Sequence, residues 1–440
     1  MSHYYKQAVY LFSCLCVVLF GGCSTSQQMA RKLQHAFRNS EVMGKYHVGF
    51  AIADLQNDKV IYSKNGDKYF TPASNTKLFT FYAALKMLPD SIPSLRYIER
   101  GDSLIFWGTG DPSFLQTALK GTRSFDFLKS SVKKLFFAKG RYTGNFYGNG
   151  WQWDDYNDYY QAEINELPMM DNLVDFRIKN GKIIVFPPFF EHYLSRDSSV
   201  MGTEFNIKRD FLSNQFYYSG PIPQSNYHQQ IPFKINTELS LLLLSDTLKK
   251  KVEWINKTIP EDAKTIYNLK TDAVLKQMML PSDNFIAEQL LLVCSNQISG
   301  ELNTEKTIKY IEKNYLKELP DPPSWVDGSG LSRGNLFTPR DIIVLLRLIY
   351  KEVNNRERLF SLLPSGGKSG TLRNAYPATE NPFVYGKTGT LSNNHNQSGY
   401  VLTKKGKIYI YSFMNNNFVL PTSEVRKEMT RIVTYIHENF

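Results

Sequence analysis

The sequence predicts a mixed α/β fold of the α+β type, and three observations lead to it. Strand patterns occur in pairs near both ends of the chain, helical patterns lie between and after them, and the middle combines many aromatic residues with short apolar stretches. Alternation of apolar and polar residues is typical of strands, whereas apolar residues recurring every three to four positions are typical of helices. With 440 residues, the chain is long enough for two or three domains of about 100 to 200 residues each.

The clearest strand patterns lie near the two ends of the chain. One pair is predicted at 47–55 and 60–63, joined by a short polar turn. A second pair is predicted at 400–402 and 408–413, and a helical pattern over 423–436 closes the chain. These patterns predict two hairpins and a final helix, but strand patterns alone do not show which strands pair.

The first residues of the chain resemble a bacterial lipoprotein signal. Lys6 precedes the apolar run 8–20, which is followed by Gly21-Gly22-Cys23. The run is too short for a membrane-spanning helix, which needs about 20 residues, but it fits a secretory signal. We therefore expect a signal peptide at 1–22, lipidation of Cys23, and a periplasm-facing lipoprotein anchored to a bacterial membrane. The alternative is ordinary cleavage nearby and a soluble exported product.

Composition narrows the possible partners. The 52 basic and 41 acidic side chains give a net charge of +11, yet no dense basic run occurs beyond 249–251 and no nucleic-acid module is recognisable. We therefore expect a generally basic solvated surface and no nucleic-acid partner, although the charge could also favour anionic envelope polymers. If the signal peptide is removed and Cys23 is lipidated, Cys294 is the one free thiol, and its apolar surroundings indicate a packed core residue.

Three short motifs follow one another along the chain: Ser74-Asn75-Thr76-Lys77, Ser282-Asp283-Asn284 and Lys387-Thr388-Gly389. Each motif alone is weak evidence, because the spacing of the first also occurs by chance, for example at Ser130 and Lys133. Lys-Thr-Gly, however, occurs only once. The order of the three motifs is the strongest functional signal in the sequence.

The first motif opens an apolar pattern over 78–85 that predicts a buried helix. Ser74 and Lys77 are then one turn apart on one helix face, so the lysine nitrogen can reach the serine hydroxyl as a base must. The positive end of the helix dipole also favours negative charge developing at Ser74. The alternative is that Ser74 only caps the helix and Lys77 is solvated.

The second motif follows a helical pattern over 272–280 that Pro281 interrupts. Such a break can project side chains into a cleft. Ser282 could relay protons, and the Asn284 amide could hold a substrate carbonyl and orient Lys77. The alternative is a helix-capping loop, because serine, aspartate and asparagine are all good caps.

The third motif lies in the extended, glycine-flanked segment 384–390, which suits an exposed sheet edge where substrate backbone can approach. Lys387 and Thr388 can bind a substrate carboxylate there, with Gly389 beside them. The alternative is an ordinary hairpin that contains a lysine.

Together the motifs resemble those of the class C low-molecular-mass penicillin-binding proteins, serine D-alanyl-D-alanine carboxypeptidases that often also act as endopeptidases. The long separation of Ser74 from Ser282 is typical of that class. Further segments are similar to the family: Gly110-Asp111-Pro112, Trp151-Gln152-Trp153-Asp154-Asp155, Asp327-Gly328-Ser329-Gly330-Leu331-Ser332 and Gly370-Thr371-Leu372-Arg373.

The resemblance implies a β-lactamase/penicillin-binding transpeptidase-like fold, in which strands from both ends of the chain share an antiparallel sheet flanked by helices. It implies a split catalytic domain at 23–97 and 263–440. The intervening segment 98–262 is then a mostly β inserted region of one or two small subdomains.

The resemblance also assigns roles. Ser74 is the acylated nucleophile, Lys77 its base and Ser282 a proton relay, with Asn284 and Lys387 completing the catalytic set. The backbone N–H groups of Ser74 and Thr390 form an oxyanion hole. The expected substrates are peptidoglycan stem peptides and the expected inhibitors are β-lactams. No metal or organic cofactor is implied, because no ligand cluster is recognisable.

Three further residues are candidates for substrate binding with open alternatives. Arg373 either contacts substrate or pins a loop beneath the Lys-Thr-Gly strand. Asp154 and Asp155 either meet the amine of a diamino acid in the stem peptide or form a solvated structural pair.

Two other functions stay open at this point. A β-lactamase of related fold would use the same acylating groups, but no Glu-x-x-Leu-Asn pattern of a deacylating glutamate occurs. A non-catalytic lipoprotein that binds muropeptides or β-lactams is the second alternative, although all the motif residues are intact.

Overall fold

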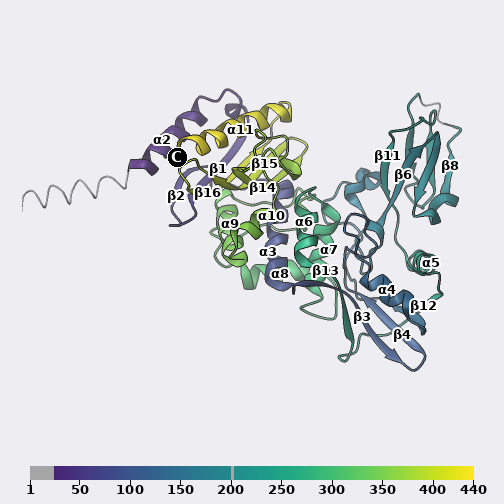
Figure 1. Cartoon of the computed structure of the whole chain (residues 1–440). Coiled ribbons are helices and arrows are strands. Elements are labelled where there is room, and N and C mark those ends of the chain that lie inside the picture. The colour runs from purple at the N-terminus through teal and green to yellow at the C-terminus, as the bar shows by residue number, and fades with distance from the viewer. Residues whose placement is uncertain (1–23, 200–202) are drawn as a thin grey trace, which may run out of the picture.

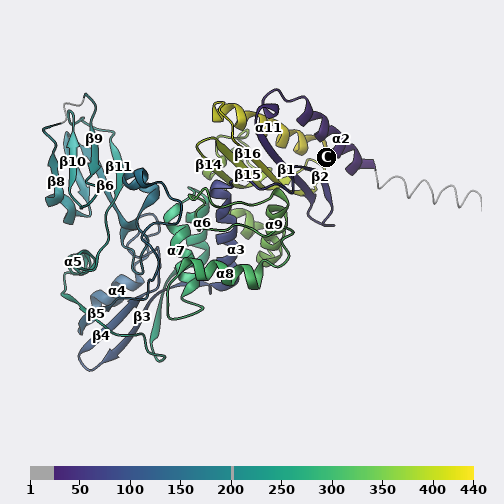
Figure 2. The same cartoon turned by 180° about the vertical axis from the view of Figure 1, so that it is seen from behind.

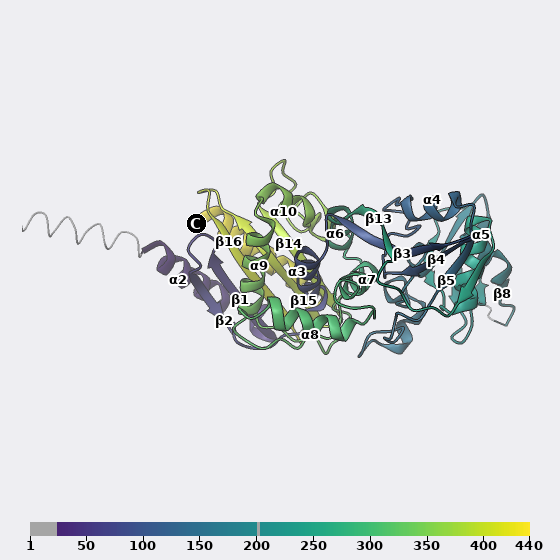
Figure 3. The same ribbon diagram turned by 90° about the horizontal axis from the view of Figure 1, so that it is seen from below.

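The computed structural model describes residues 24–199 and 203–440. Three parts follow one another along its long axis, and they are a sheet covered by the first and last helices, a cluster of helices, and a region rich in strands (Figure 1, Figure 3). The predicted signal peptide 1–22 and the lipidation site Cys23 lie outside the described residues. Among those that are described, no helix is long and apolar enough to span a membrane.

The first sheet is antiparallel and has the strand order β14-β15-β16-β1-β2. Phe50 in β1 lies opposite Phe413 in β16, so the two ends of the chain share one sheet. This arrangement confirms the fold class that the resemblance implied. The strands are β1 (His47–Asp54), β2 (Val60–Lys64), β14 (Val384–Leu391), β15 (Asn394–Leu402) and β16 (Ile408–Asn416).

Helices cover both faces of this sheet, because successive apolar residues of a strand point to opposite faces. Phe50 packs under α2 and α11, whereas its neighbour Ala51 belongs to the core beneath α3 and α9. Figure 2 shows α2 and α11 side by side above the sheet. The helices of the sheet part and the helical cluster are α2 (Ser24–Arg38), α3 (Lys77–Met87), α6 (Thr271–Met279), α7 (Asn284–Ser295), α8 (Thr304–Tyr315), α9 (Pro339–Val353), α10 (Arg356–Leu362) and α11 (Thr422–Asn439).

The strand-rich part holds a second five-stranded sheet, of order β12-β5-β4-β3-β13, and two three-stranded sheets, β11-β6-β7 and β8-β10-β9. Its helices are α4 (Arg123–Ser130) and α5 (Thr237–Leu248). Its strands are β3 (Ser91–Arg100), β4 (Ser103–Gly108), β5 (Lys134–Ala138), β6 (Leu173–Lys179), β7 (Lys182–Phe186), β8 (Leu194–Arg196), β9 (Asn206–Arg209), β10 (Phe216–Ser219), β11 (His228–Pro232), β12 (Val252–Ile255) and β13 (Lys264–Lys270).

Short 3-10 helices connect these elements: η1 (Met43–Lys45), η2 (Ala73–Thr76), η3 (Trp153–Asn157), η4 (Tyr159–Gln161), η5 (Met170–Asn172), η6 (Pro188–Tyr193) and η7 (Gly370–Leu372). The expected domain boundary at residue 97 falls inside β3, which pairs with β13 just beyond the other boundary. The division into a split catalytic domain and an inserted region stays a prediction.

Candidate active site

Ser74 and Lys77 lie at the junction of two helices. The 3-10 turn η2 runs directly into α3, so Lys77 is the first residue of α3 and Ser74 lies one turn before it. Lys77 Nζ is 3.0 Å from Ser74 Oγ, 2.7 Å from Asn284 Oδ1 and 2.8 Å from the Ser329 carbonyl oxygen. The lysine therefore points at the serine hydroxyl and is held there by three oxygen acceptors.

Burial makes the neutral form of Lys77 more accessible than that of an exposed lysine. The side chain is fully buried, and this burial lowers the pKa of Lys77 to about 8, although the charges of Glu288, Asp283 and Asp327 oppose the shift. At neutral pH, a pKa of about 8 leaves roughly a tenth of the side chains as free amine. Lys77 can therefore accept a proton from Ser74.

Ser282 lies in the loop between α6 and α7 and has a left-handed backbone, with φ of 68°. Such a conformation is uncommon for a non-glycine residue and concentrates at functional sites. Its neighbour Asp283 caps α7, because Asp283 Oδ1 accepts a hydrogen bond of 2.9 Å from the Ile286 N–H. The capping interpretation therefore holds for Asp283, whereas Ser282 Oγ contacts the third motif.

Asn284, the first residue of α7, joins the helical cluster to the strand-rich part. Its Oδ1 accepts the hydrogen bond from Lys77, and its Nδ2 donates to the backbone carbonyl of Tyr160 at 3.1 Å. Because both ends of the amide are occupied, the orientation of Asn284 is fixed, and with it the position of the lysine nitrogen. The carbonyl of Tyr160 is a contact that sequence reasoning missed.

Lys387 on β14 completes a second polar pair. Its side chain is fully buried, and Nζ donates to Ser282 Oγ at 2.8 Å and to the Thr388 carbonyl at 2.7 Å. Burial, followed by the charge of Lys77, holds the pKa of Lys387 well below its usual range. Each lysine therefore contacts one motif serine, Lys77 with Ser74 and Lys387 with Ser282.

Gly389 lets β14 approach Ser74 closely. A Cβ at this position would lie 2.4 Å from the Pro72 carbonyl oxygen and 2.7 Å from the Ser74 nitrogen. These separations are far below van der Waals contact, so only glycine fits. The strand therefore runs beside the Ser74 N–H, where the proposed oxyanion hole requires the neighbouring Thr390 N–H to be.

The threonines of β14 have partners that the sequence did not indicate. Thr388 Oγ1 donates to Thr371 Oγ1 at 2.7 Å, and Thr390 Oγ1 lies 2.8 Å from Nδ1 of His395. These contacts fix the two hydroxyl groups along the edge strand.

The three motifs open into one cleft of about 760 Å³. Asp155 lies in this cleft, and burial raises its pKa. Asp154 is exposed and does not line the cleft, and Arg373 lines a neighbouring cavity. The cleft is lined by Ser74, Ser282, Asn284, Thr388 and Thr390 together with Asp155, Tyr160, Asp171 and Gln230 of the strand-rich part.

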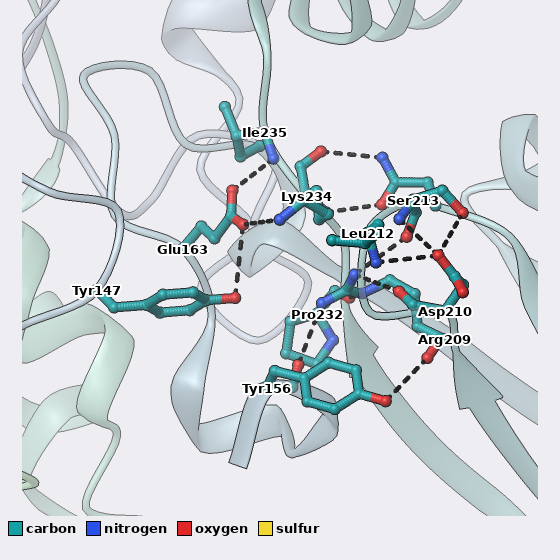
Figure 4. A network of polar contacts seen from close by, with 11 residues as sticks. Tyr147, Tyr156, Glu163, Arg209, Asp210, Leu212, Ser213, Pro232, Lys234 and Ile235 are labelled. Atoms are coloured by element: carbon teal, nitrogen blue, oxygen red, sulfur yellow. Dashed lines mark hydrogen bonds and ion pairs between the residues drawn. The ribbon is translucent and has the colours of Figure 1, made fainter. Parts of the chain in front are cut away.

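A buried arginine holds the turn that carries the two aspartates. Arg209 on β9 is 2% exposed, and its guanidinium donates to the Pro232 carbonyl at 2.7 Å and lies over the Tyr156 ring (Figure 4). The Arg209 N–H also donates to Asn157 Oδ1 at 2.8 Å. Both Tyr156 and Asn157 belong to η3, so the position of Asp155 depends on the sheet behind it.

Glu288 is a second residue that sequence reasoning missed. It is 1% exposed, lies one turn after Asn284 on α7, and accepts hydrogen bonds from the N–H groups of Gly328 (3.0 Å) and Ser329 (2.7 Å). This fixes the Ser329 carbonyl that receives Lys77. An acidic residue in a mostly apolar helix was the available signal.

The chain also matches known proteins along most of its length. Residues 29–438 match the model of the D-Ala-D-Ala carboxypeptidase 3 (S13) family. The D-alanyl-D-alanine carboxypeptidase DacB of Haemophilus influenzae is 23% identical over 425 residues, which cover 84% of this chain and 85% of that protein.

Solved structures show the same fold. Penicillin binding protein 4 (dacB) of Haemophilus influenzae matches with a TM-score of 0.73 at 18% identity, covering 92% of this chain and 99% of that one. Its complex with a novel β-lactam matches with a TM-score of 0.66 at 17% identity, covering 93% and 99%. Bd3459, a predatory peptidoglycan endopeptidase of Bdellovibrio bacteriovorus, matches with a TM-score of 0.53 at 14% identity, covering 89% and 93%.

Proposed function

Since the chain belongs to the D-Ala-D-Ala carboxypeptidase 3 (S13) family and is a serine peptidase of the class C penicillin-binding type, we propose that it acts through an ester formed on Ser74. The observation that carries this proposal is the 3.0 Å separation of Ser74 Oγ from the buried Lys77 Nζ. A nucleophile within reach of a base that is itself oriented is the arrangement that covalent catalysis requires.

In the first step, the Ser74 hydroxyl gives its proton to neutral Lys77, and Oγ bonds to the penultimate D-alanine carbonyl carbon. The N–H groups of Ser74 and Thr390 stabilise the negative oxygen that forms. Ser282 Oγ lies beside Lys387. It passes its proton to the departing nitrogen, and Lys77 gives Ser282 the proton that it took from Ser74. The amide C–N bond breaks, and D-alanine leaves as a free amine.

In the second step, water attacks the ester carbonyl. Lys77 takes one proton from the water and gives it to Ser74 Oγ as the ester bond breaks, so the serine hydroxyl and the neutral lysine are restored. The shortened stem peptide leaves as a carboxylic acid. Before these two steps, Thr388 binds the terminal carboxylate of the intact substrate, with Lys387 beside it. Gly389 keeps the strand close enough to Ser74 for these contacts.

We propose peptidoglycan stem peptides as substrates, and cross-linked stem peptides as further substrates of a DD-endopeptidase activity. The same acylation makes β-lactams inhibitors, in keeping with the β-lactam complex of the Haemophilus influenzae protein. The β-lactamase and non-catalytic alternatives are disfavoured, because the matching family is a carboxypeptidase family and its motif side chains are in mutual contact here.

Release of D-alanine from a synthetic stem pentapeptide tests this function. The wild-type protein should release one D-alanine per peptide, and Ser74→Ala should release none while remaining folded. Absence of release by the folded wild-type protein, or release by Ser74→Ala, would contradict the proposal.

We further propose that the protein is exported as a lipoprotein and that a lipid attached to Cys23 anchors it to the membrane. The basis is the pattern at the start of the chain and the envelope substrate of the family. Cys23→Ser should abolish incorporation of labelled fatty acid and release the protein from the membrane fraction, whereas Cys16→Ser should leave both unchanged. Labelling of the Cys23→Ser protein would contradict lipidation at this residue.

A further inference from the structure

A second cavity, of about 700 Å³, adjoins the active-site cleft along β14. It lies between η7, β14, β15 and the first turns of α11. Thr371, Thr388 and Thr390 line both this cavity and the active-site cleft. The two spaces therefore meet at the threonine that we assign to the substrate carboxylate.

Positive charge dominates the wall of this cavity. Arg373, Arg426 and Lys427 line it, whereas no aspartate or glutamate does so. Throughout residues 24–199 and 203–440, none of these three side chains forms an ion pair, and Glu428 on the same helix is paired with Arg431 instead (2.6 Å). Unpaired arginines are forked donors that suit carboxylates.

The start of α11 strengthens the positive field, whereas His395 adds no charge to it. Ser423 and Arg426 lie near the start of α11, where the helix dipole favours anions. His395 lines the same wall, and burial together with the charges of Arg426 and Lys387 lowers its pKa to about 3. The cavity therefore receives its positive charge from the arginines and the lysine, beside a neutral imidazole.

We propose that this cavity binds carboxylates on the leaving peptide of a cross-linked substrate, with Arg426 as the residue that determines this specificity. The inference rests on the proposed function and deepens it. D-alanine, the leaving group of a pentapeptide, is small and carries one carboxylate, which Thr388 engages. An acceptor stem peptide carries more carboxylates further from the scissile amide, and a space of 700 Å³ next to Thr388 can receive them.

Turnover of two substrates tests the inference. We would measure kcat/KM for a soluble cross-linked tetrapeptide dimer and for a stem pentapeptide, with wild type, Arg426→Gln and Arg426→Lys. Because one charge-assisted hydrogen bond contributes about 1.5 to 3 kcal/mol, Arg426→Gln should lower kcat/KM for the dimer about 10-fold to 100-fold. The loss for the pentapeptide should be at least about 10-fold smaller, and Arg426→Lys should restore part of the dimer activity.

Arg356→Gln is the matched control, because Arg356 is also an exposed arginine at the start of a helix, and it lies outside both spaces. It should leave both activities unchanged. Equal losses on the two substrates for Arg426→Gln, or no loss on the dimer, would overturn the inference while the carboxypeptidase stands. Failure of the wild type to release D-alanine from the pentapeptide would instead overturn the proposed function.

Discussion

Lys387 Nζ donates a hydrogen bond of 2.8 Å to Ser282 Oγ and thereby joins the edge strand β14 to the loop before α7. The two residues are 105 positions apart in the sequence. The left-handed backbone of Ser282 aims its hydroxyl at this lysine while Asp283 caps the helix. The contact therefore brings the second and third motifs together.

Replacing Ser282 by alanine should slow acylation because the proposed relay to the leaving nitrogen is lost. General acid catalysis by one positioned group contributes about 10²-fold to 10⁴-fold, so kcat/KM for the stem pentapeptide should fall by that order. Ser240→Ala is the control, since this buried serine bonds the Asn236 carbonyl in the strand-rich part. A Ser282→Ala protein of normal activity would exclude the relay.

The pH dependence of acylation should report Lys77. Its folded pKa of about 8 lies below the ordinary lysine value, and the neutral amine is the active form. The acylation rate by benzylpenicillin should therefore fall about 10-fold per pH unit as pH decreases below about 8, and level off above it. Stopped-flow or quenched measurements from about pH 5 to about pH 10 would show this, and a flat profile through 8 would rule out Lys77 as the base.

Replacing Gly389 by alanine should displace β14 from Ser74, because the new Cβ has no space beside the Pro72 carbonyl. Loss of one oxyanion donor costs about 10²-fold to 10³-fold in kcat, and we expect a fall of that size in D-alanine release. Gly44→Ala is the matched control, since its Cβ would meet nothing within 4 Å. If Gly389→Ala kept full activity, the close approach would have no role in catalysis.

Local sequence patterns were the basis for predicting the positions of individual helices and strands. The predicted helix at 423–436 is α11 at Thr422–Asn439, and the predicted strand at 47–55 is β1 at His47–Asp54. Such elements follow from apolar periodicity over a few residues. The pairing of β1 with β16 came from the family resemblance, because periodicity gives no information about which strands are neighbours.

The spacing of Ser74 and Lys77 was predictable because residues three apart share a helix face. The contacts that orient Lys77 were not, since the Ser329 carbonyl and Asn284 belong to segments more than 200 residues away. The strand-rich part was the hardest to predict from the sequence, for the same reason. Its parallel pairing of β4 with β5 depends on tertiary packing that no short window encodes.

Acylation of Ser74 is the central step of the proposed mechanism, and intact mass after brief incubation with benzylpenicillin tests it most directly. Wild type should gain the mass of one penicilloyl group, and Ser74→Ala, verified as folded by circular dichroism, should gain none. An adduct on Ser74→Ala, or no adduct on wild type with the drug intact or destroyed, would contradict the account.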